Sequence, residues 1–243
     1  LLATLQRVYE NPVDIEYTVN CGENGDFLVN LLQCRPLYVG QNREAVQIPA
    51  LKAERTFFDI YDTCMGRSSC RKLDALVLVD PKEYYEYPYA RKSEVAGVIG
   101  RINRYLLSQP EKKNVLLAVP GRIGTSSPEL GIPAAFAELS GYCGICEVSD
   151  DRAGYMPELS FGSHMFQDLV EADIFYAAIY ADREEICYHR DCFADCPDLF
   201  AKICPQEEGL SSMISVYDLA GMEVYLWMDA PGSHAACGVK DRE

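Results

Sequence analysis

Basic residues are scarce in this chain of 243 residues, which has 22 lysines and arginines against 37 aspartates and glutamates, for a formal net charge of -15. A surface this acidic repels a phosphate backbone, so we expect no nucleic-acid partner. A single nucleotide remains possible, because one site needs only a few local cations and backbone N–H groups. The acidity itself is typical of a surface that keeps a protein in solution.

Long apolar runs are also missing. No run approaches the roughly 20 residues that span a bilayer, so we expect no membrane partner. Leu1-Leu2-Ala3 lacks the basic start and long apolar centre of a signal peptide. Because the chain also begins without methionine, we interpret it as a fragment of a larger protein.

Cysteine, by contrast, is abundant, with 11 residues that lie mostly in apolar runs. Free cysteine behaves as a small buried hydrophobe, and a disulfide framework usually belongs to a smaller secreted chain. We therefore expect a cytoplasmic protein with reduced thiols. A metal site remains an alternative, because Cys192 and Cys196 form a loose pair and Cys143 and Cys146 a tighter one.

Strands and helices alternate after about residue 73. Buried strands are predicted over residues 73–79, 114–119 and 144–148, with later strands over 214–217 and 223–228. Amphipathic helices are predicted over Ser93–Leu107 and Ser163–Tyr180, each capped by its serine. Residues 50–61 fit either a strand or a helix, and 64–72 read as a loop. The pattern predicts a layered α/β domain with a mixed or partly parallel sheet.

The first part of the chain has a different pattern. Residues 1–10 have helical spacing, and Asn11-Pro12 ends that helix. Strands over 13–19 and 27–34 flank a turn-rich linker, which predicts a hairpin. We place a domain boundary in the irregular segment that follows, giving domains of residues 1–38 and 39–243.

The predicted hairpin carries polar residues at alternating positions. Asp14 and Glu16 share one strand face, as do Gln33 and Arg35, and the hairpin would bring the two faces together. A carboxylate can hold Mg²⁺ beside a substrate phosphate, and an arginine can grip phosphate oxygens. The alternative is an exposed face with an ordinary cross-strand ion pair.

These residues also carry a resemblance. Asp14-Ile15-Glu16-Tyr17 followed by Leu31-Leu32-Gln33-Cys34-Arg35-Pro36 resembles the closing hairpin of the ATP-grasp domain in phosphoenolpyruvate synthases and pyruvate, phosphate dikinases. The resemblance implies that Glu16 ligates Mg²⁺ beside ATP, and that Gln33 and Arg35 contact nucleotide or phosphate. It also implies a missing N-terminal ATP-grasp portion as partner, because most of such a site lies upstream. The chain would then be a fragment of an ATP-dependent phosphotransferase, inactive alone.

A second polar stretch follows the buried strand at 114–119. Its glycines could turn backbone N–H groups toward an anion, and Arg122, Thr125, Ser126 and Ser127 could add donors. Ligands usually gather at the carboxyl ends of strands in such sheets. The stretch is neither a Walker A loop nor a dinucleotide-binding fingerprint. The alternative is a structural loop.

Ser163 and His164 open a predicted helix whose N-terminus could also receive an anion. His164, Asp168 and Glu171 share one face, which suits a metal or acid–base chemistry, but equally a helix cap with a local His–Asp contact. Both stretches resemble segments that follow the ATP-grasp domain in a subset of dikinase-like proteins. This resemblance implies membership of that family but assigns no role to these residues.

The sequence therefore supports two further functions besides the phosphotransferase fragment. One is a non-catalytic module that binds a small phosphate or carboxylate ligand, or docks on a partner, through Arg122 and the helix opened by His164. The other is a metal-stabilised scaffold built on the cysteines.

Overall fold

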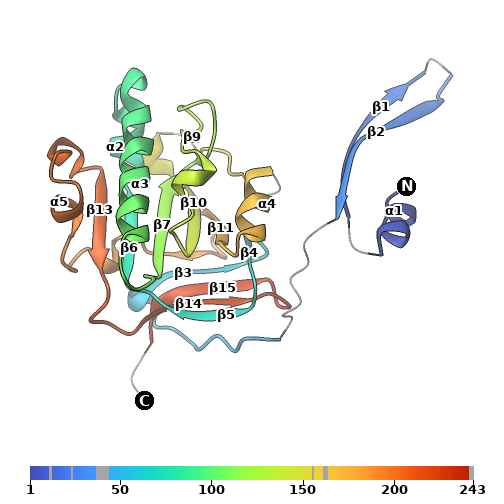
Figure 1. The fold of residues 1–243 in the computed structure, drawn as a ribbon. Helices are drawn as coiled ribbons and strands as arrows, with labels where there is room; N and C mark the ends of the chain where they lie inside the picture. Colours follow the sequence, from blue (N-terminus) through green and yellow to red (C-terminus); the bar gives the residue numbers. More distant parts are fainter. Residues whose placement is uncertain (11–12, 23, 37–43, 155, 161–163, 241–243) are drawn as a thin grey trace. The chain divides into compact units, whose positions relative to one another are not determined.

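The computed structural model describes residues 1–10, 13–22, 24–36, 44–154, 156–160 and 164–240 (Figure 1). The chain divides into two compact units, Leu1–Gln41 and Asn42–Glu243, and each is described by itself. The predicted boundary between residues 38 and 39 lies within 37–43, outside the described residues.

The first unit is a helix followed by a hairpin. It consists of α1 (Leu2–Tyr9), β1 (Val13–Cys21) and β2 (Phe27–Pro36). The two strands pair antiparallel, with a bulge between Glu16 and Tyr17. The predicted hairpin is confirmed.

The second unit is built on a six-stranded sheet in the order β13-β6-β7-β10-β11-β4. Its four central strands are parallel: β6 (Ala75–Val79), β7 (Val115–Pro120), β10 (Gly144–Ser149) and β11 (Phe175–Tyr180). The edge strands β13 (Ile214–Asp218) and β4 (Cys64–Met65) run antiparallel to their neighbours. The predicted partly parallel sheet is confirmed.

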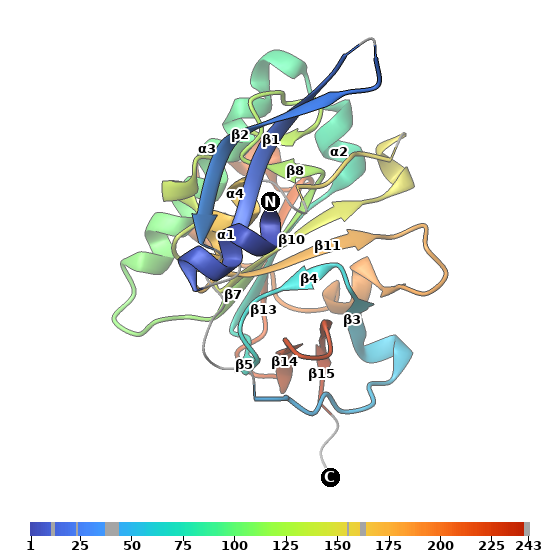
Figure 2. The same cartoon turned by 90° about the vertical axis from the view of Figure 1, so that its right-hand side faces the viewer.

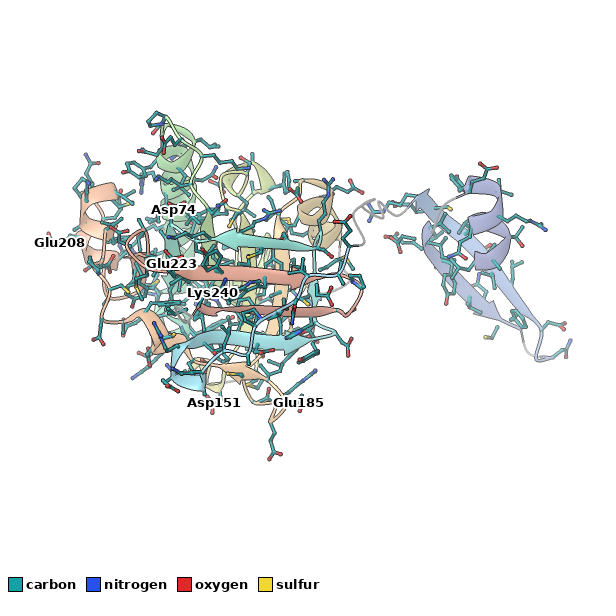
Figure 3. All side chains as sticks on the ribbon, turned by 90° about the horizontal axis from the view of Figure 1, so that it is seen from below. Asp74, Asp151, Glu185, Glu208, Glu223 and Lys240 are labelled. Carbon is teal, nitrogen blue, oxygen red and sulfur yellow. The ribbon has the colours of Figure 1, made fainter. Side chains whose placement is uncertain are left out.

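A second sheet has five antiparallel strands in the order β12-β3-β15-β14-β5. They are β12 (Cys187–Tyr188), β3 (Thr56–Tyr61), β15 (His234–Val239), β14 (Val224–Asp229) and β5 (Ser69–Lys72). Figure 3 shows this sheet from its outer side. A short parallel pair, β8 (Arg122–Ile123) with β9 (Gly131–Ile132), lies in the loop after β7.

Four α-helices complete the described part of this unit: α2 (Pro81–Glu86), α3 (Lys92–Leu107), α4 (His164–Glu171) and α5 (Phe200–Ile203). Single 3₁₀ turns lie at Ala53–Arg55, Tyr89–Arg91, Phe136–Glu138, Asp151–Ala153, Arg190–Phe193 and Glu208–Leu210. Within the described ranges, no helix combines the length and the apolarity that crossing a membrane requires.

The core has two parts because the central strands are apolar on both faces. Val77 on β6 packs with Val98 and Ile99 of α3, on the helix side of the sheet. Leu76, its neighbour on β6, packs with Phe58 of the five-stranded sheet on the other side. The unit therefore has three layers: helices, the six-stranded sheet and the five-stranded sheet (Figures 1 and 2). This confirms the predicted layered α/β domain.

The predicted helix over Ser163–Tyr180 is wrong in its second half. α4 ends at Glu171, and Phe175–Tyr180 forms β11, which lies between β10 and β4. Asp173 has a left-handed backbone (φ 59°), which ends the helical path. A strand buried on both faces is a continuous apolar run, and such a run also fits a buried helix.

Two smaller predictions are also corrected, and one alternative that the sequence left open is decided. Ser93 does not cap α3, which begins at Lys92 directly after a 3₁₀ turn. The predicted loop at 64–72 contains the short strands β4 and β5, whose pairing depends on distant partners. Residues 50–61, left open between helix and strand, form a 3₁₀ turn and then β3. Ser163 itself lies outside the described residues.

Candidate functional site

The carboxyl ends of the parallel strands form one edge of the six-stranded sheet. β6 ends just before Asp80, β7 leads into the loop at 121–133, and β10 ends just before Asp150. Parallel strands place their carboxyl ends at a common edge, which is where α/β sheets usually bind ligands. The polar stretch that follows β7 and contains Arg122 therefore lies at the expected edge.

The glycines of this loop serve close backbone packing. Gly121 has φ 66°, and a Cβ added there would collide with the carbonyl of Leu130. A Cβ added at Gly131 would collide with the backbone of Arg122, its partner in the β8–β9 pair. Only glycine fits positions where two backbones approach so closely.

Three backbone amides of this loop donate hydrogen bonds to carbonyl groups within the protein. Gly121 N donates to Val148 O over 2.9 Å, Arg122 N donates to Leu130 O over 2.9 Å, and Gly124 N donates to Ile132 O over 2.8 Å. These groups do not turn toward an anion. A ligand at this edge would therefore have to be bound mainly by side chains.

The buried carboxylate of Glu147 connects three segments at this edge of the sheet through hydrogen bonds. Glu147, on β10, has no exposed surface. Its Oε1 accepts a hydrogen bond from Ile123 N over 2.8 Å, and its Oε2 accepts one from Ser160 N over 2.5 Å and one from the Tyr176 hydroxyl over 2.8 Å. Burial raises the pKa of Glu147, and these hydrogen bonds oppose the rise. One side chain thus joins the glycine-rich loop, the segment before α4 and β11.

Arg122 lies at the exposed side of this cluster. Its Nη2 donates to Glu158 Oε2 over 2.6 Å, and the Glu158 side chain is 78% exposed. The Nε of Arg122 is buried and has no hydrogen-bond partner in the part of the chain that the structure describes. The Arg122 guanidinium is therefore paired with the exposed side chain of Glu158, which an anionic ligand could displace.

The loop and the start of α4 are neighbours. A Cβ added at Gly124 would collide with the Met165 side chain, in the first turn of α4. The structure thus brings the Arg122 loop beside the helix that His164 opens, although the His164 side chain is not among those described. Thr125 and Ser127 close a local turn, with Ser127 N donating to Thr125 Oγ1 over 3.1 Å, and Ser126 is exposed.

A second arginine reaches the same edge from far along the chain. Arg190 pairs through Nη2 with Oδ2 of Asp80, and the two side chains are only 16% and 17% exposed. Asp80 also caps α2, accepting from Glu83 N over 2.8 Å. The Nε of Arg190 is buried without a hydrogen-bond partner among the described residues. This ion pair holds the segment that contains Cys187 and Cys192 beside the end of β6.

In the first unit, the hairpin register gathers the predicted polar face. Asp14 lies opposite Arg35, and Glu16 lies opposite Gln33. Directly opposed residues of an antiparallel pair point to the same side, so all four side chains share one face. Arg35 Nε lies 3.5 Å from Asp14 Oδ2. The predicted arrangement of Glu16, Gln33 and Arg35 is confirmed, while their ligands remain a prediction.

The same unit buries little of its apolar surface by itself. Val13 is its one buried residue among those described. Its exposed large apolar side chains are Leu1, Leu2, Val8, Tyr9, Tyr17, Val19, Phe27, Leu28, Val29, Leu31 and Leu32. A helix and a two-stranded hairpin with so small a core are marginally stable alone.

Several of the cysteines are packing residues of the core, whereas Cys21 and Cys70 are exposed. Cys64, Cys143, Cys146 and Cys237 are buried between the two sheets. Burial raises the pKa of Cys143 to about 12, so this thiol stays protonated. In the residues that the structure describes, no group of three histidine, cysteine or acidic side chains is arranged to hold a metal ion.

Comparisons of the chain with protein-family models, curated proteins and solved structures found no match. The resemblance to phosphoenolpyruvate synthases and dikinases therefore remains a prediction. It is carried by the hairpin residues and by the two stretches around Arg122 and His164.

Proposed function

We propose that this chain is part of an ATP-dependent phosphotransferase of the phosphoenolpyruvate synthase or pyruvate, phosphate dikinase type. The supporting observation is the polar hairpin face, where Glu16 opposes Gln33 and Asp14 opposes Arg35. Glu16 ligates Mg²⁺, which prefers oxygen ligands and substrate phosphates. Gln33 and Arg35 hold phosphate oxygens. Phosphoryl transfer depends mainly on such positioning and charge neutralisation.

On this proposal the first unit is completed by the upstream portion of an ATP-grasp domain. The apolar side chains that α1 and the hairpin do not bury within their own unit support a covering surface outside it, because so large an apolar surface is costly to leave in water. The 243-residue chain alone therefore has the metal-binding carboxylate without the rest of the nucleotide site, and it is inactive.

The proposal is tested by ³¹P NMR of the full-length protein with Mg-ATP and pyruvate, with and without added phosphate, because a dikinase also needs phosphate as the acceptor of the second phosphoryl group. We expect Mg²⁺-dependent consumption of ATP and formation of phosphoenolpyruvate, and no ATP consumption by the 243-residue chain. ATP consumption by that chain alone would contradict the proposed division of the site. The phosphotransferase would be contradicted by full-length protein that consumes no ATP with pyruvate, with or without phosphate, and forms no ATP from phosphoenolpyruvate and AMP with either phosphate or pyrophosphate.

A second function is supported for residues 42–243: binding of a small phosphate or carboxylate ligand at the carboxyl edge. The specific observation is that Glu147 ties the Arg122 loop to Ser160, beside the first turn of α4. A ligand anion would replace Glu158 on the guanidinium, with the helix N-terminus adding a favourable dipole.

Two variants of opposite effect test this site. In calorimetric titrations of the chain with phosphate and phosphoenolpyruvate, Arg122→Gln should weaken binding about tenfold by removing a charge-assisted hydrogen bond. Glu158→Gln should strengthen binding, because it removes the competing carboxylate. Equal affinity in wild type and Arg122→Gln would rule out this anion site. No binding of either ligand would favour the docking module instead.

A further inference from the structure

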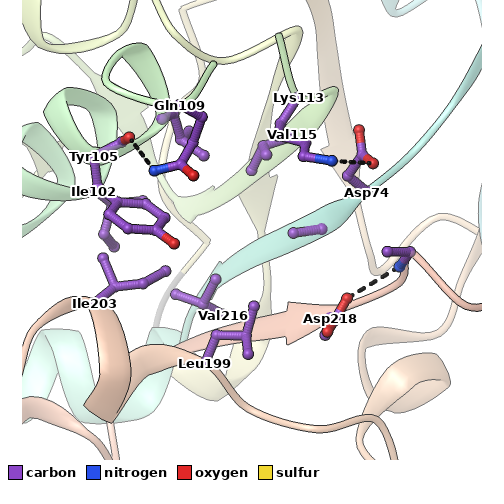
Figure 4. Close-up of a pocket in the computed structure, with 13 residues that line it drawn as sticks. Asp74, Ile102, Tyr105, Gln109, Lys113, Val115, Leu199, Ile203, Val216 and Asp218 are labelled. Carbon is purple, nitrogen blue, oxygen red and sulfur yellow. Dashed lines mark hydrogen bonds and ion pairs between the residues drawn. The ribbon is translucent and has the colours of Figure 1, made fainter. Parts of the chain in front are cut away.

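A separate pocket lies at the opposite edge of the six-stranded sheet. It has a volume of about 220 Å³ and lies among α3, α5 and β13 (Figure 4). Its floor includes Ala75 and Val115, where β6 and β7 begin. The candidate anion site lies where those strands end, so the two sites are distinct.

The walls of the pocket are mostly apolar. Ile102 and Leu106 come from α3, Leu199 and Ile203 from the α5 segment, and Val216 from β13. Figure 4 shows the ring of Tyr105 among them, with its hydroxyl pointing into the pocket. An apolar cavity of about 150 Å³ accepts benzene, so this pocket has room for one ring and a short side chain.

The mouth of the pocket carries more negative than positive charge. Asp74 and Asp218 line it together with one cation, Lys113. Asp74 Oδ1 lies 3.5 Å from Lys113 Nζ. Asp218 Oδ1 accepts only a backbone hydrogen bond, from Ala220 N over 3.1 Å, in the described part of the chain. The carboxylate of Asp218 is therefore the acidic group at this mouth that no cation neutralises among the described residues.

The two acids are neighbours because their strands pair. Asp218 on β13 lies opposite Ala75 on β6, and Leu219 N donates to Asp74 O over 2.9 Å. The surrounding protein adds to the negative potential, since the whole chain has a net charge of -15. Such a field favours a cationic ligand and disfavours an anionic one.

We propose that this pocket binds a small organic amine, with one ring or branched chain in the apolar part and its ammonium group at Asp218. The Tyr105 hydroxyl supplies a further hydrogen-bonding group inside an otherwise apolar wall. Pocket size limits such a ligand to about ten non-hydrogen atoms. This ligand chemistry differs from the nucleotide and small anion of the proposed functions, so their failure and this one are distinguishable.

Three probes of similar size and different charge test the proposal on the 243-residue chain. They are phenethylamine, 2-phenylethanol and 3-phenylpropionate, measured by ligand-observed NMR titration. We expect phenethylamine to bind about tenfold tighter than the neutral alcohol, because its ammonium group donates a charge-assisted hydrogen bond to Asp218, and the carboxylate to bind weakest. Absence of phenethylamine binding up to millimolar concentration, or equal binding of the amine and the carboxylate, would overturn the proposal.

Two substitutions locate the binding. Asp218→Asn should remove the preference for the amine and leave binding of 2-phenylethanol unchanged. Ala220→Phe should weaken both ligands at least tenfold, because Ala220 lines the pocket yet is exposed, so a larger side chain there fills the mouth without disturbing the core. Thermal unfolding checks that both variants fold. Unchanged amine binding in folded Ala220→Phe would place the ligand elsewhere and contradict the proposal.

Discussion

Replacing Glu147 by leucine is expected to lower the free energy of unfolding of the α/β unit by about 4 kcal/mol. The carboxylate is fully buried and accepts hydrogen bonds from Ile123 N, Ser160 N and the Tyr176 hydroxyl. Leucine leaves three buried donors without an acceptor, and each orphaned donor costs about 1–3 kcal/mol. The loss should also loosen the Arg122 loop, because Glu147 is what fastens Ile123 to β10.

Urea denaturation followed by far-UV circular dichroism measures this cost. Glu147→Gln is the conservative companion: it keeps one acceptor oxygen but turns an N–H₂ group toward backbone donors, so we expect an intermediate loss. Glu185→Leu is the matched control, since Glu185 is exposed and its replacement should change stability by less than about 0.5 kcal/mol. A loss below about 1 kcal/mol in Glu147→Leu would mean that Glu147 does not hold this edge together.

Glu147 also shows which kind of contact cannot be predicted from the sequence. A single acid inside the apolar strand Gly144–Ser149 is visible in the sequence, and such a residue needs partners when buried. Its partners come from three separate segments, at residues 123, 160 and 176. The same holds for Arg190, which meets Asp80 across 110 positions. Contacts between segments this distant depend on the tertiary fold and leave no local pattern.

Local patterns, in contrast, were sufficient for the hairpin and for most central strands. The hairpin follows from two alternating strands around a turn, and its polar face follows from the two-residue period of a strand. β6, β7 and β10 are short apolar runs ended by glycine, proline or aspartate, so their limits are marked in the sequence.

Among the strands that were mispredicted or missed, β11 and β15 show how the fold overrides local preference. β11 continues the apolar pattern of α4 after only three residues, so periodicity alone extends the helix through it. β15 contains Ala235, Ala236 and Gly238, which have low strand propensity. These small residues form a strand because β3 and β14 pair with it on both sides. Of these two partners, β14 directly precedes β15 in the sequence, whereas β3 lies far away, at residues 56–61.

Glu16→Gln is expected to have the largest effect on function, lowering Mg²⁺-dependent nucleotide affinity by on the order of 100-fold. The amide is neutral and a poorer ligand for Mg²⁺, so the ion that bridges protein and phosphate is lost. Arg35 and Gln33 remain on the same face, and the phosphate contacts proposed for them do not involve the metal, so nucleotide binding without Mg²⁺ should change little.

Asp26→Asn provides a control of equal charge change. Asp26 lies at the turn end of the same hairpin and is exposed, so this variant removes one carboxylate without touching the polar face. It should bind nucleotide like the wild type, with and without Mg²⁺. Equal weakening by Asp26→Asn would indicate a general charge effect and no metal ligand at Glu16.

The most direct test of the phosphotransferase proposal is calorimetric titration of the full-length protein with ADP, with and without Mg²⁺, because nucleotide binding does not depend on which acceptor the enzyme uses. We predict that Mg²⁺ strengthens ADP binding in wild type and in Asp26→Asn, and that Glu16→Gln loses this gain. The same Mg²⁺-dependent gain in Glu16→Gln as in wild type would contradict the assignment of the hairpin face to a Mg-nucleotide site.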